Sequence, residues 1–121
     1  MSPVLKSPDA LVDQAWAQQY SDPGFAHELA RQALATSTPS DRAYAWGWLC
    51  VGYYRVRYAA APSAESALLE ARAAAERLGL RRVYHLAGNG LAWLMACRGD
   101  AEGAITLLRS ALDDHASELA P

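Results

Sequence analysis

The chain has 121 residues, 52% of them hydrophobic, and a formal net charge of −2, which fits one globular domain with a modest core. This charge gives no basic field, so we expect neither nucleic acid nor a membrane surface as a partner. No apolar run approaches the length of a bilayer span, and residues 1–8 lack the apolar segment of a secretory signal. A cytoplasmic location is therefore expected.

A tight turn joins the first two predicted helices. Ser7 or Asp9 can cap the first helix, which extends to about residue 20. The turn follows at residues 21–24, and the second helix covers about residues 25–35, because proline after aspartate is a common helix start. We expect residues 1–8 to be an N-terminal tail and residues 9–121 to form one domain.

The third predicted helix, residues 42–58, follows a polar loop and is capped by Ser40 or Asp41. It is apolar nearly all round. Its apolar residues are Tyr44, Trp46, Trp48, Leu49, Val51, Tyr53, Tyr54 and Val56. A helix without a polar face is buried between neighbours, so we expect this helix at the centre of the molecule.

The last three predicted helices cover residues 64–78, 81–97 and 101–119. Pro62 breaks the connection before the first of them, and Ser63 is the expected N-cap, in a capping box with Ser66. Gly79 suits the position just after the helix end. Gly99 and Asp100 form the turn before the last helix. No residue is left for a sheet, so the expected fold class is all-α.

Three triplets recur with the spacing i, i+4, i+7, which places each triplet on one helix face. They are Ala26-Ala30-Ala33, Ala67-Ala71-Ala74 and Ala104-Leu108-Ala111, with first members 41 and 37 residues apart. Such a period is typical of helical repeat arrays, in which each unit is a helix pair. We therefore expect three antiparallel helical hairpins, with repeats at about 9–38, 41–79 and 81–119. The small residues mark where the two helices of a pair approach closely.

The first helix of each pair resembles that of a tetratricopeptide repeat (TPR). Trp48-x-x-Val51-Gly52 is similar to the Trp-x-x-Leu-Gly of that family, Leu91-Ala92 stands at the Leu-Gly place, and Arg98-Gly99-Asp100 is similar to its usual turn. The resemblance implies a right-handed α-solenoid in which Gly52 and Ala92 contact Ala67 and Ala104. The chain departs from the pattern at Arg55, where tyrosine is common, and in the first repeat, which lacks the Trp and Gly.

A narrower resemblance concerns the first repeat. Its motifs are Ala15-Trp16, Tyr20-Ser21-Asp22-Pro23 and Ala30-Arg31-Gln32-Ala33-Leu34, together with Glu76-Arg77-Leu78-Gly79 in the second. They look like the N-terminal sensory arrays of bacterial signalling proteins, many of which precede a diguanylate cyclase domain. No cyclase motif is present in the chain. The resemblance implies a sensory fragment whose C-terminal effector domain is missing from this chain.

The first helices of the repeats are expected to line a concave surface. The candidate binding residues there are Trp16, Trp46, Leu49, Tyr53, Arg57, Leu86, Asn89 and Trp93. They predict either an aromatic groove for a peptide or helix, with Arg57 and Asn89 as polar anchors, or a core in which Trp16, Tyr53 and Trp93 pack together. These aromatic residues occupy the surface that a carboxylate clamp would need, so no such clamp is predicted.

No catalytic, metal or cofactor site is expected. Cys50 and Cys97 lie in different helices without a CxxC pair, and we expect both to be buried small hydrophobes. His27, His85 and His115 share no ligand spacing and are expected to be solvated or capping residues.

The sequence thus predicts a non-catalytic interaction or sensory module that binds a protein or peptide or mediates dimerisation. A small-molecule sensor using the aromatic groove is the alternative. The last helix carries more apolar residues than one hairpin can bury, which favours a homodimer or docking site at that end. These residues are Ile105, Leu108, Leu112 and Leu119, beside the polar Asp113, Asp114, His115 and Glu118.

Overall fold

The computed structural model describes residues 6–119, with side chains up to residue 114. Its elements are α1 (Pro8–Gln18), α2 (Pro23–Thr36), α3 (Arg42–Tyr58), α4 (Ala61–Leu78), α5 (Arg81–Cys97) and α6 (Ala101–Leu119). No strand occurs within this range, so the predicted all-α class is confirmed. None of these helices is both long and apolar enough to cross a membrane.

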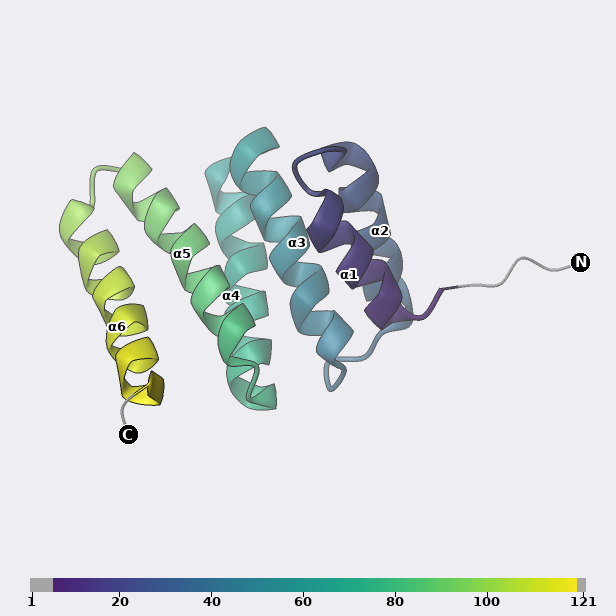
Figure 1. Cartoon of the computed structure of the whole chain (residues 1–121). Helices are drawn as coiled ribbons and strands as arrows, with labels where there is room; N and C mark the ends of the chain where they lie inside the picture. Colours follow the sequence, from purple (N-terminus) through teal and green to yellow (C-terminus); the bar gives the residue numbers. More distant parts are fainter. Residues whose placement is uncertain (1–5, 120–121) are drawn as a thin grey trace, which may run out of the picture.

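The helices stand side by side in two layers (Figure 1). Each helix packs against the next one in the chain, and α3 also contacts α1 and α5. In the part of the chain that the structure describes, the backbone of α4 approaches neither that of α2 nor that of α6. The odd-numbered helices therefore form a continuous layer in which α3 is central. They run in one direction in Figure 1, and the even-numbered helices run in the other.

The small residues of the first two alanine triplets are buried at helix contacts. Ala30, Ala33, Ala67, Ala71 and Ala74 have no exposed surface, and Ala26 is 3% exposed. On α6 the packing differs from the prediction. Ala104 is buried, but Leu108 is exposed, and Leu107, which the triplet omits, packs against the core instead. Helix α6 is therefore rotated about its axis relative to the predicted inner face.

Gly52 lies against α4, as the sequence predicts, and the atoms nearest to a Cβ added there belong to Leu68. A Cβ added at Gly52 would lie 2.5 Å from Leu68 Cδ2 and 3.4 Å from Leu68 N. Leu68 is fully buried and also reaches α5, where a Cβ at Gly90 would lie 2.8 Å from Leu68 Cδ1. The two glycines give this leucine room between three helices.

Several predicted helix ends were wrong by a few residues. Helix α1 begins at Pro8, inside the predicted tail, with Ser7 Oγ accepting a hydrogen bond from Ala10 N, and it ends at Gln18. Helix α4 begins at Ala61 with Ala60 as its N-cap, so the predicted cap at Ser63 is wrong. Proline in the first helical turn lacks only an N–H that would have no partner there, so Pro62 starts the helix where a break was predicted.

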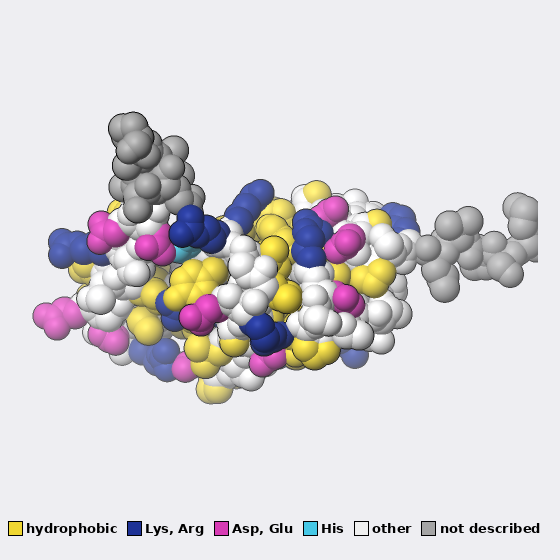
Figure 2. All heavy atoms as spheres, turned by 90° about the horizontal axis from the view of Figure 1, so that it is seen from below, with side chains coloured by type: hydrophobic (Ala, Val, Ile, Leu, Met, Phe, Trp, Pro, Cys, Tyr) yellow, Lys and Arg dark blue, Asp and Glu magenta, His cyan; other side chains and the backbone are white. Residues whose placement is uncertain are grey.

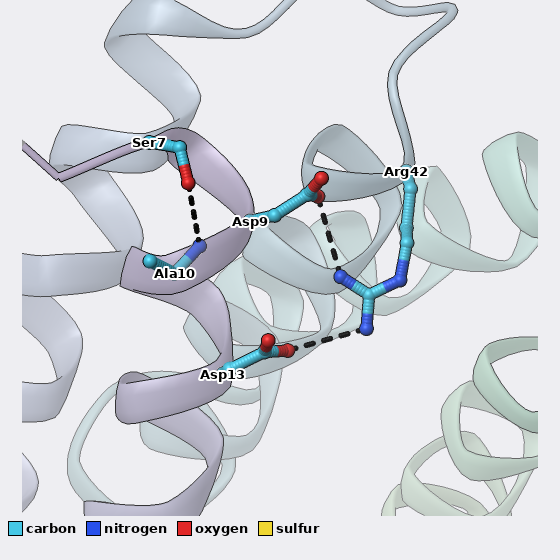
Figure 3. Close-up of polar contacts among 5 residues, drawn as sticks. All are labelled: Ser7, Asp9, Ala10, Asp13 and Arg42. Atoms are coloured by element: carbon cyan, nitrogen blue, oxygen red, sulfur yellow. Dashed lines mark hydrogen bonds and ion pairs between the residues drawn. The ribbon is translucent and has the colours of Figure 1, made fainter.

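Arg42 ties the start of α3 to α1. Its guanidinium donates to the carboxylates of Asp9 and Asp13, each at 3.2 Å (Figure 3). The two aspartates are one helical turn apart, so one forked side chain can reach both. The contact fixes how the first two members of the odd-numbered layer lie against each other.

Candidate binding groove

The candidate residues on α1 and α3 pack mainly against one another. The Trp16 ring lies 5.4 Å from that of Trp46, edge to face, and 5.3 Å from that of Tyr53. Trp46 is only 9% exposed and Leu49 is fully buried. The structure therefore places Trp46 and Leu49 in the core and not on a groove, and Trp16 is held between them and Tyr53.

Trp93 on α5 is not part of this cluster. Its side chain is 61% exposed. It borders a hollow of about 440 Å³ between α3, α5 and the segment that follows α1. We call this hollow the Trp93 groove; it is lined by Tyr20, Tyr53, Val56, Arg57, Asn89, Gly90 and Trp93. The structure thus brings four predicted residues together: Tyr53, Arg57, Asn89 and Trp93.

Arg57 is held at the edge of the groove by several contacts. Its Nη2 donates to the carbonyl oxygen of Gln19 at 3.2 Å and its Nε to that of Tyr53 at 3.4 Å. The guanidinium carbon lies 4.8 Å from the ring centre of Tyr20 and 5.6 Å from that of Tyr58. Both tyrosines are largely exposed. Cation–π contacts of this kind orient an arginine without neutralising its charge.

Tyr53 forms the floor of the groove. Its hydroxyl donates to the carbonyl oxygen of Leu86 at 2.7 Å, which joins α3 to α5. Burial, with a smaller effect of Tyr20, raises the pKa of Tyr53 to about 12. A phenol with so high a pKa is a poor acid or base near neutral pH. Leu86, another candidate, is partly buried and lines a neighbouring groove between α5 and α6.

The sequence missed Tyr20 and Val56 as groove residues. Tyr20 was assigned to the apolar face of the first helix, but α1 ends at Gln18 and Tyr20 lies in the loop beyond it. Val56 follows Tyr53 by three residues, so both lie on one face of α3. This spacing could have identified Val56 as a groove residue from the sequence.

The cysteines and histidines differ in part from the predictions. Cys50 is buried, and burial raises its thiol pKa to about 12, but Cys97 is exposed. His27 stacks on Tyr54, with ring centres 4.1 Å apart, and His85 Nε2 lies 3.6 Å from an Asp114 carboxylate oxygen. The side chain of His115 lies outside the described residues. Within residues 6–114, whose side chains the structure describes, no cluster of His, Cys, Asp and Glu could hold a metal ion.

Comparison with family models, curated proteins and solved structures finds no match to this chain.

Proposed function

We propose that the chain is a non-catalytic protein-interaction module that binds a peptide segment of a partner in the Trp93 groove. The proposed architecture is a TPR-like, right-handed α-solenoid of three antiparallel helical hairpins. Its sequence motifs resemble those of TPR domains, and the continuous odd-numbered layer supports it. The narrower resemblance favours a cytoplasmic, bacterial signalling protein with a C-terminal effector domain beyond this chain.

The exposed Trp93 side chain carries the binding proposal. A tryptophan that is 61% exposed beside an apolar hollow offers a large surface that a partner can cover, and tryptophan and tyrosine are enriched among residues that dominate binding energy. Arg57 and Asn89 add a positive charge and an amide at the rim. The groove therefore suits a peptide with an apolar anchor side chain next to a carboxylate or a backbone carbonyl.

The chemistry of the groove favours binding over catalysis. Its lining contains two tyrosines, an arginine and an asparagine but no carboxylate, histidine, serine or cysteine. The Tyr53 hydroxyl donates to a backbone carbonyl and has a raised pKa. Recognition is what these groups provide, since general acid–base chemistry needs a group that titrates near the working pH.

A peptide library displayed on phage and selected against the whole chain tests this function. Peptides that bind the wild type should lose at least about tenfold in affinity, or 1.4 kcal/mol, on Trp93→Ala and on Arg57→Ala. Leu69→Ala is the matched control, because Leu69 is also exposed but lies on α4 away from the groove. Selected peptides that bind Trp93→Ala as tightly as wild type would contradict the proposal.

The groove volume favours the second candidate, a small-molecule sensor. A hollow of about 440 Å³ is within the range of about 300–1,000 Å³ that small-molecule sites occupy. A thermal-shift screen of aromatic carboxylates distinguishes the two functions. Compounds that raise the melting temperature of the wild type but not of Trp93→Ala would favour the sensor, provided that no peptide is selected.

A further inference from the structure

The three even-numbered helices carry a stripe at matching positions that is apolar except for His27. Counted from the first residue of each alanine triplet, the stripe is His27, Ala30 and Leu34 on α2, Leu68, Ala71 and Ala75 on α4, and Ile105, Leu108 and Leu112 on α6. On α4 all three residues are buried. On α6 they are 49%, 41% and 67% exposed. Residues at these matching sequence positions are therefore covered on α4 and exposed on α6.

The molecule itself shows what covers this face. Helix α3 packs on α1 and α2, and helix α5 packs on α3 and α4. Each brings a glycine over the stripe: a Cβ at Gly47 would lie 2.8 Å from Leu34 Cδ2, and one at Gly90 would lie 2.8 Å from Leu68 Cδ1. No helix within residues 6–119 takes this place on α5 and α6.

A groove of about 680 Å³ lies at that place. We call it the α5–α6 groove; it is lined by Arg81, Arg82, His85, Leu86, Asn89, Leu108, Ala111 and Leu112. Leu86, Leu108 and Leu112 form its apolar part. The α5–α6 groove corresponds to the position that α3 occupies on α1 and α2 and to the position that α5 occupies on α3 and α4.

Ion pairs join the covering helices to the grooves they cover. Arg42, at the start of α3, pairs with Asp9 and Asp13 of α1 at 3.2 Å. Arg98, just after α5, pairs with Glu65 of α4 at 2.9 Å. One covering helix, α3, is thus held by ion pairs at its beginning, and the other, α5, by an ion pair at its end.

The charges of the α5–α6 groove differ between its two ends. The exposed Arg82 lies at the start of α5, and none of the carboxylates in residues 6–114 lines the groove, although Asp114 pairs with His85 beside it. Near the start of α6, Glu102 is exposed at the position that matches Glu65 on α4. On the face of the molecule that Figure 2 shows, basic and acidic side chains are interspersed.

We propose that the α5–α6 groove binds an amphipathic helix of a partner protein, parallel to α5, with carboxylates in its first turn and a lysine or arginine in its last. The first turn lies beside Arg82 and the last beside Glu102. A glycine or alanine of the partner lies over Leu108 and Leu112, as Gly47 and Gly90 do over Leu34 and Leu68. This site shares Asn89 with the Trp93 groove, but it is built on α5 and α6, and binding there does not depend on the function of the Trp93 groove.

Two synthetic peptides of 17 residues test the charge order. Both carry the same apolar stripe with a central alanine, and a hydrocarbon staple on the outer face keeps both helical. The first has glutamates in the first turn and lysines in the last, and the second has them exchanged. Binding of the labelled peptides to the whole chain is measured by fluorescence anisotropy. The first peptide should bind at least about tenfold more tightly than the second.

Three variants locate the binding. Leu112→Glu should abolish binding of the first peptide, because it places a charge in the apolar part of the groove. Arg82→Glu should remove most of the preference between the peptides. Trp93→Ala, in the other groove, should leave both affinities unchanged. All three positions are exposed, and thermal melts confirm that the variants fold.

Other outcomes overturn the proposal. Equal affinities for the two peptides would reject the charge order, and absence of saturable binding would reject a helix seat. Loss of binding in Trp93→Ala would move the peptide to the Trp93 groove. A dimer in sedimentation experiments that Leu112→Glu dissociates, without binding of either peptide, would make a second copy of this chain the occupant.

Discussion

Leu68 is the side chain at which α3, α4 and α5 meet. It is fully buried, and Gly52 and Gly90 approach it from α3 and α5. Its position decides how closely both neighbouring helices pack on α4. Packed interiors respond to changes of a single methyl group, so the stability of the centre should be sensitive to the two glycines.

Gly52→Ala should lower the free energy of unfolding by about 1–3 kcal/mol, as overpacking does in well-packed cores. The added Cβ would lie 2.5 Å from Leu68 Cδ2 and 2.8 Å from its Cγ, so the fully buried Leu68 side chain would have to shift. Urea unfolding monitored by circular dichroism measures the change. Gly24→Ala is the control, because nothing lies within 4 Å of its added Cβ; equal stability of both variants would reject the tight contact.

His27 should make stability depend on pH. Burial, and then the positive charges of Arg31 and Arg55, lower its pKa in the folded chain below the usual 6.5. The unfolded chain therefore binds the proton more readily, and the free energy of unfolding should fall as pH drops through 6.5. His27→Phe keeps a ring against Tyr54. Between about pH 7.5 and 5.5 its urea midpoint should change less with pH than that of the wild type. An unchanged slope would show that His27 does not contribute.

At the scale of the helices, the ends of α3, α5 and α6 could be predicted from the sequence. Polar loops and the glycines at 79 and 99, both at positive φ, mark them clearly. The start of α4 could not, because Pro62 is compatible both with a break and with a first helical turn. Whether Pro62 interrupts the helix or lies in its first turn depends on how close α3 and α4 lie, which is a tertiary property.

The candidate site could be predicted only in part for a similar reason. Helix α3 is apolar nearly all round, so its sequence does not indicate which side faces solvent. Trp46 and Leu49 were therefore grouped with Tyr53, although α1, α2, α4 and α5 cover most of α3. Helix α5 has Asn89 and Trp93 on one exposed face, and here the pattern did locate the groove. The rotation of α6, which places Leu107 inward, depends on packing against Gly88.

The contact between α1 and α3 should depend on Arg42. Arg42→Gln removes the ion pairs with Asp9 and Asp13 and the guanidinium 5.5 Å from the Trp46 ring centre. These groups are exposed, so the loss should be only about 0.5–1 kcal/mol, and it should appear as faster hydrogen exchange in α1. Arg31→Gln, which removes an exposed ion pair with Glu28 within α2, is the control. Unchanged exchange in α1 would show that apolar packing alone holds this helix.

At the scale of the whole molecule, the number of neighbours differs strongly between helices. Helix α3 packs against α1, α2, α4 and α5, whereas the described part of α6 has close backbone contacts with α5 only. In addition, α6 exposes Ile105, Leu108 and Leu112. Local opening is easiest where few apolar contacts are broken, so the free energy of opening should increase from α6 towards the centre.

Native-state hydrogen exchange measured by mass spectrometry should therefore show the slowest amides in α3 and the fastest in α6. Opening of α6 breaks one helix contact, while opening of α3 requires that nearly the whole chain unfold. The first peptide described above should slow exchange in α6 and at the start of α5, because a helix in the α5–α6 groove adds the missing neighbour. Leu112→Glu provides the control, since it should prevent this protection. Equal exchange rates in α3 and α6 would mean that the chain opens as one cooperative unit, and α6 would then need no partner for its stability.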